Sequence, residues 1–88
     1  LMIMYKLIYN YKETNDNEVL EREYYFGEMF RTRKSAVHYL LDKIQSKFVG
    51  YGYRTQQIES GTIHCYRSEL TTKNELKVIE WTISVKKV

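Results

Sequence analysis

The chain has 88 residues, with 14 basic and 11 acidic side chains and a formal net charge of +3 at pH 7. Apolar residues make up 43% and charged residues 28% of the sequence, a balance that is typical of globular proteins and excludes a disordered chain. A chain of this length buries enough surface for one core, so we expect a single domain over residues 2–88. Leu1, which precedes Met2, is interpreted as the remnant of a tag or of a misread start.

The apolar segments are too short to cross a membrane, which takes roughly 20 residues, and the N-terminus lacks the order of a signal peptide. Cys65 is the only cysteine, so no internal disulfide can form. A lone thiol is typical of a reducing compartment, and we therefore expect a cytoplasmic protein without a membrane partner. The absence of proline and the many Ile, Lys, Asn and Tyr residues indicate AT-rich coding, as in a low-GC bacterium, its phage or its plasmid.

Residues 2–11 alternate in hydropathy and predict a strand that is apolar on both faces, which favours a central position. One face of this strand holds Ile3, Tyr5, Leu7, Tyr9 and Tyr11. The polar segment 13–17 predicts a chain reversal, and residues 18–26 predict a second strand that ends at Gly27.

The segment after this hairpin predicts the one helix, with Thr32 or Ser35 as N-cap, an end near Val49, and Gly50 as the C′ residue. Its apolar stripe of about 100° must lie on a sheet. The stripe consists of Val37, Leu40, Leu41, Ile44 and Phe48.

The last third of the chain predicts three strands. Residues 54–59 and 62–70 are joined by a tight turn at Ser60 and Gly61, and residues 76–86 show the cleanest alternation in the sequence. The order ββαβββ favours an α+β domain, a two-layer sandwich in which one helix packs on a mainly antiparallel sheet.

Catalytic motifs are not evident. His64 and Cys65 are neighbours on a predicted strand, so their side chains point to opposite faces and cannot form a nucleophile and base pair. Glu21 and Glu23 share a strand face, but the sequence places no third ligand beside them. We therefore expect a non-enzymatic protein without a metal or a cofactor.

Charge is distributed unevenly along the chain: residues 1–30 carry three basic and six acidic side chains, whereas residues 31–88 carry eleven and five. Cations at the start of a helix oppose its macrodipole, so the three there suggest an anion or partner site, unless Glu28 and the acidic strand neutralise them. With the second hairpin they would form a basic stripe beside tyrosines. The predicted site comprises Arg31, Arg33, Lys34, Tyr51, Tyr53, Arg54 and Arg67.

The leading functional hypothesis is a small protein-binding module, a regulator or inhibitor of a larger host protein encoded by a phage or another mobile element. A nucleic-acid-binding protein that uses the basic stripe, with Tyr51 and Tyr53 stacking on bases, is the first alternative. A toxin-like ribonuclease is the second. We also expect a homodimer through an edge strand or the uncovered sheet face.

Overall fold

The computed structural model describes residues 2–16 and 18–88. Leu1 and Asn17 lie outside the described residues, and so do the interpretation of Leu1 and the end of the predicted turn at 13–17. The strands are β1 (Tyr5–Asn15), β2 (Glu18–Tyr24), β3 (Met29–Phe30), β4 (Arg54–Glu59), β5 (Thr62–Leu70) and β6 (Leu76–Lys87).

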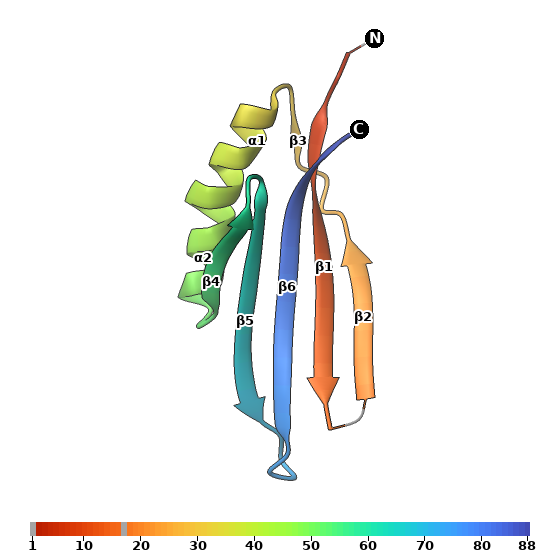
Figure 1. Ribbon diagram of the computed structural model, residues 1–88, viewed down its shortest axis with the longest axis vertical. Helices are drawn as coiled ribbons and strands as arrows, with labels where there is room; N and C mark the ends of the chain where they lie inside the picture. The colour runs from red at the N-terminus through yellow and green to blue at the C-terminus, as the bar shows by residue number, and fades with distance from the viewer. Residues whose placement is uncertain (1, 17) are drawn as a thin grey trace.

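The strands form one sheet in the order β2-β1-β6-β5-β4, and β3 pairs with β1. Every described pair of strands is antiparallel. One helix packs on one face, so the predicted α+β sandwich is confirmed, with the short β3 as an addition to the predicted order (Figure 1). β1 and β6 lie side by side at the centre of the sheet. For β1, the two apolar faces of residues 2–11 predicted this central position.

The predicted ends of the first hairpin were wrong. β1 begins at Tyr5 rather than at residue 2, and residues 13–15, predicted as a turn, continue the strand. They do so because β2 and β6 both pair with them and supply their backbone hydrogen bonds. β2 ends at Tyr24, two residues early, and the chain turns at Gly27 (φ 88) before it rejoins β1 as β3.

The helix consists of α1 (Arg33–Tyr39) and α2 (Gln45–Gly50), which a π-helical turn at Leu40–Ile44 joins. Thr32, one of the two predicted caps, is the N-cap, and its side-chain oxygen accepts a hydrogen bond from the backbone N–H of Ser35 at 3.1 Å.

Three residues spaced four apart form the centre of the buried stripe: Ala36, Leu40 and Ile44. In an α-helix this spacing advances by more than one turn, so the stripe would drift around the helix. The wider π-helical turn reduces that drift and keeps the stripe on the sheet. The sequence placed Leu40 and Ile44 in this stripe but not Ala36.

The helix ends in a Schellman motif that positions the aromatic residues after it. The N–H of Tyr53 donates to the carbonyl of Phe48 and that of Gly52 to the carbonyl of Val49, both at 3.0 Å. Gly52 has φ 86 and is therefore the C′ residue, so the prediction of Gly50 was wrong. Because the chain leaves the helix at Gly52 and not at Gly50, the Tyr53 ring contacts Phe48, with centroids 5.1 Å apart.

The core lies between the helix and the sheet, and the molecule is elongated, with extents of 52 × 22 × 20 Å. The helix covers only part of the sheet's length, and the hairpins β1–β2 and β5–β6 extend past its end (Figure 1). In the part of the chain that the structure describes, no helix has the length and hydropathy to span a membrane. The buried cluster consists of Leu7, Tyr9, Leu40, Ile44, Ile63, Cys65 and Ile83.

Candidate partner-binding surface

The structure separates the predicted site residues into three places. Arg31, Arg33 and Lys34 stand at the start of the helix, whereas Tyr51, Tyr53 and Arg67 meet at its other end. Arg54 pairs with Tyr66, and both project from the face opposite Arg67. Cys65, which lies in the core, shares the face of Arg67, two residues later, and alternates with its neighbour Tyr66. The predicted residues therefore do not form one continuous basic stripe.

Arg33 has a structural role at the start of the helix. Its guanidinium donates to the carbonyl of Ser60 at 2.8 Å and to the Ser60 hydroxyl at 3.2 Å, which ties the helix to the β4–β5 turn. Gly61 makes room for this contact, since a Cβ there would lie 2.6 Å from Arg33 Nη2. Among the described residues, Arg31, Arg33 and Lys34 form no ion pair, and Glu28 bonds to Tyr9 instead.

An aromatic groove lies at the C-terminal end of the helix, where the sheet extends past it. It consists of two adjoining hollows that share the side chains of Phe48, Tyr51 and Trp81 as walls. The Arg67 hollow, completed by Tyr53, has a volume of about 360 Å³. The Glu28 hollow has a volume of about 270 Å³, and its further lining consists of Tyr9, Phe26, Glu28, Ile44 and Lys47.

Arg67 organises the first hollow. Its guanidinium stacks over the Tyr53 ring at 4.8 Å and donates to the Tyr51 carbonyl at 2.9 Å, so a cation caps the negative end of the helix dipole. The Trp81 indole N–H donates to the Tyr53 hydroxyl at 3.3 Å. Within the described structure, Arg67 Nε is buried without a hydrogen-bond partner.

Glu28 and Tyr9 organise the second hollow. The Tyr9 hydroxyl donates to Glu28 Oε2 at 2.6 Å, and the Tyr9 ring packs edge-on against Phe26, with centroids 4.7 Å apart. Burial, and then the Glu28 carboxylate, raise the pKa of Tyr9 far above its ordinary value, so Tyr9 stays a hydrogen-bond donor. At the rim, Tyr51 is 63% and Phe26 is 60% exposed.

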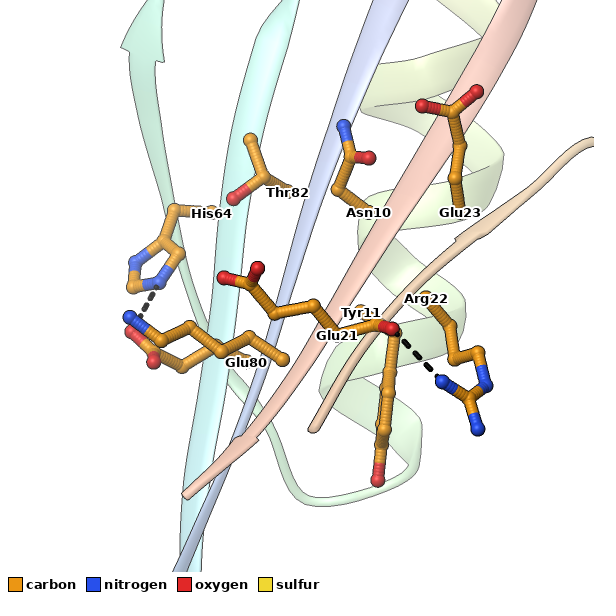
Figure 2. A pocket seen from close by; sticks show the side chains of 9 residues that line it. Asn10, Tyr11, Glu21, Arg22, Glu23, His64, Glu80 and Thr82 are labelled. Atoms are coloured by element: carbon orange, nitrogen blue, oxygen red, sulfur yellow. Dashed lines mark hydrogen bonds and ion pairs between the residues drawn. The ribbon is translucent and has the colours of Figure 1, made fainter. Parts of the chain in front are cut away.

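A third hollow, of about 530 Å³, is a polar trough on the face of the sheet away from the helix, here called the open face (Figure 2). Register places Lys12 between Glu21 on β2 and Glu80 on β6. His64 Nε2 lies 3.1 Å from Glu80 Oε1. The side chains of Glu21, Glu80 and His64 converge in Figure 2, whereas Glu23 points away from them.

The sequence did not predict this trough, because it placed no third ligand beside Glu21 and Glu23. Glu80 and His64 reach the trough only through the order of the strands in the sheet. No group of three or more His, Cys, Asp or Glu residues in the described ranges is arranged to hold a metal ion. The two histidines lie on different surfaces. His64 lines the trough, whereas His38 is exposed on the helix and lies 3.3 Å from Asp42.

Sequence reasoning also missed the groove. Phe48 and Trp81 belong to the predicted apolar patterns and were interpreted as core residues. Phe26 had no assigned partner, and Glu28 was considered only as a group that neutralises the cations at the start of the helix. Trp81 follows the alternation of Ile83 and faces the helix side, but it lies where the last helical turn ends. The signal that was available is the run of aromatic residues around Gly52, directly after the helix.

No family model matches the chain, and comparison with curated proteins and with solved structures found none similar to it.

Proposed function

We propose that this chain is a protein-binding module that docks a segment of a larger protein in the aromatic groove and acts by occupying that segment. The observation that carries the proposal is the partly exposed cluster of Trp81, Tyr51, Tyr53, Phe26 and Arg67 at the end of the helix. Trp, Tyr and Arg are the residues that most often dominate the binding energy of protein interfaces.

Exposure of the rim supports a docking role over a purely structural one. Phe26 and Tyr51 leave more than half of their surface in water although buried rings lie next to them. Their burial by a partner would release a favourable hydrophobic free energy that the isolated fold does not use. The ring pairs and the Arg67 stack hold the groove in shape, so binding costs little ordering entropy.

The groove favours a protein partner over a nucleic acid. The cations at the start of the helix lie at its far end from the groove, and Arg54 projects from the open face. Arg67 is engaged by the Tyr51 carbonyl and lies 3.4 Å from Glu69. A backbone of regularly spaced phosphates calls for a continuous track of cations, which these positions do not supply.

The test is affinity capture from lysate of a low-GC bacterium, with and without nuclease treatment and with and without phage infection, followed by mass spectrometry. Tagged wild type is compared with Tyr51→Ala and Phe26→Ala, and Tyr25→Ala serves as control. Tyr25 is a similarly exposed aromatic residue that Lys6 covers on the open face, so its loss leaves the groove intact.

We expect one protein to be captured stoichiometrically by wild type and by Tyr25→Ala. With that partner purified, Tyr51→Ala should weaken binding at least about thirtyfold, because hot-spot truncation costs about 2 kcal/mol or more. Equal capture by all variants would overturn the assignment of the groove. Capture that disappears with nuclease treatment would favour the nucleic-acid alternative.

A further inference from the structure

The Glu28 hollow combines a small volume with aromatic walls. At about 270 Å³ it lies below the roughly 300–1,000 Å³ of small-molecule sites, so it suits one inserted side chain rather than a cofactor. Phe48 and Trp81 lie with centroids 5.7 Å apart, and Phe26, which also lines the hollow, packs against Tyr9. Aromatic faces at this density attract a cation and also pack against an aliphatic stem.

Among the described residues that line this hollow, Glu28 is the only carboxylate, and one of its oxygens has no partner. Glu28 Oε2 accepts the Tyr9 hydroxyl, while Oε1 is buried and has no hydrogen-bond partner among the described residues. A buried acceptor without a donor is costly, so a ligand that brings a donor to Oε1 gains more than the same contact would gain in water. Tyr9 cannot supply that donor because its single proton is already shared with Oε2.

From this geometry we infer that the Glu28 hollow receives a lysine side chain of the docked protein, whose ammonium pairs with Glu28 Oε1 between the aromatic rings. An ammonium fits better than a guanidinium. Arginine recognises a carboxylate through both oxygens at once, and here Tyr9 occupies one of them. The inference rests on the proposed function and names the chemistry of its partner.

Lys47 of this chain is the competing occupant. It lines the same hollow from the helix, is exposed, and forms no ion pair with the residues that the structure describes. Its positive charge would repel a second cation in the hollow unless the Lys47 side chain moves away. Any test must therefore separate a partner's lysine from Lys47.

Trp81 is the only tryptophan of the chain and lines the hollow, so its indole N–H signal in NMR reports on occupancy. The probes are Nα-acetyl-lysine methylamide, which keeps the side-chain ammonium, its norleucine counterpart, which lacks the ammonium, and its arginine counterpart. They are titrated into wild type, Glu28→Gln and Lys47→Ala. Glu21→Gln on the open face is the matched control, and thermal unfolding checks that each variant is folded.

We expect a saturable shift of the Trp81 signal with the lysine probe and a weaker response to the other two. Glu28→Gln keeps an acceptor for Tyr9 but removes the charge, so it should weaken binding about tenfold or more, whereas Glu21→Gln should not. An equal response to the norleucine probe, or unchanged binding in Glu28→Gln, would overturn the inference. Binding to Lys47→Ala alone would overturn it as well and would assign the hollow to Lys47.

Capture of the partner separates this inference from the proposed function. If Tyr51→Ala loses the partner but Glu28→Gln retains it with unchanged affinity, the groove binds a protein without using a lysine, and only this inference fails. If both variants lose the partner, both stand. If neither does, the proposed function itself fails.

Discussion

The two faces of the sheet are made by the same strands but differ in what they contact. On β6, Ile83 faces the helix and is fully buried, whereas its neighbour Thr82 lines the polar trough of the open face. Across β2, β1 and β6 the open face carries Glu21, Lys12 and Glu80 in one row. Charges of alternating sign on adjacent strands attract one another, so the polar centre of this face does not need an apolar cover.

This difference bears on the expected self-association. The apolar residues of the open face are separated by its polar centre: Ile8 is buried near one end, and Val19 is exposed near the other. A homodimer stays a prediction, but a continuous apolar open face no longer supports it. The helix side, where the aromatic groove lies, carries the larger cluster of exposed aromatic residues.

The largest effect on stability should come from replacing a side chain on the core face of β6, compared with a replacement on its open face. Ile83→Ala removes buried methyl groups from the core and should lower the free energy of unfolding by about 3 kcal/mol. Thr82→Ala, one residue away, should cost less than about 1 kcal/mol. Urea unfolding measures both, and equal losses would contradict the division of the sheet into a core face and a solvated face.

An intermediate effect should come from the Cys65 thiol at high pH. Burial raises the pKa of Cys65 from 9.0 to about 12, so the thiol favours folding in its neutral form. Its contribution is fully present below about pH 9, where the unfolded thiol is also neutral, and is lost as the pH rises toward 12. Between pH 8 and pH 11, wild type should therefore lose on the order of 2 kcal/mol more stability than Cys65→Ala.

The comparison with Cys65→Ala cancels the ionisation of tyrosines, which both proteins share. Urea unfolding at the two pH values gives the difference. Parallel losses in the two proteins would mean that the thiol is not held in the core.

The smallest effect should come from the open face. His64 and Glu80 are 3.1 Å apart with side chains 26% and 30% exposed, so solvent screens their attraction. A double-mutant cycle with His64→Gln and Glu80→Gln should give a coupling of about 0.5 kcal/mol. A coupling above about 2 kcal/mol would indicate that the trough is a rigid, desolvated site and would make it the stronger functional candidate.

Several elements were predictable because their signals are local. The alternation of residues 76–86 predicted β6, Thr32 was one of two predicted caps, and Ser60 with Gly61 forms the predicted turn. The ends of β1 and the helix terminus were not predictable with equal accuracy. A strand between two partners extends through polar residues, and the C′ residue is Gly52 rather than Gly50, in a Schellman motif in which Tyr53 packs on Phe48.

The sequence by itself determined the class of fold, because side-chain periods of two and about 3.6 follow from backbone geometry and are visible in any segment. Only the tertiary structure decided which residues meet. Tyr9 bonds Glu28 across 19 positions, and Arg67 bonds Tyr51 across 16. Such contacts depend on strand order and on where the helix ends, which are set by packing of the whole chain and not by local preference.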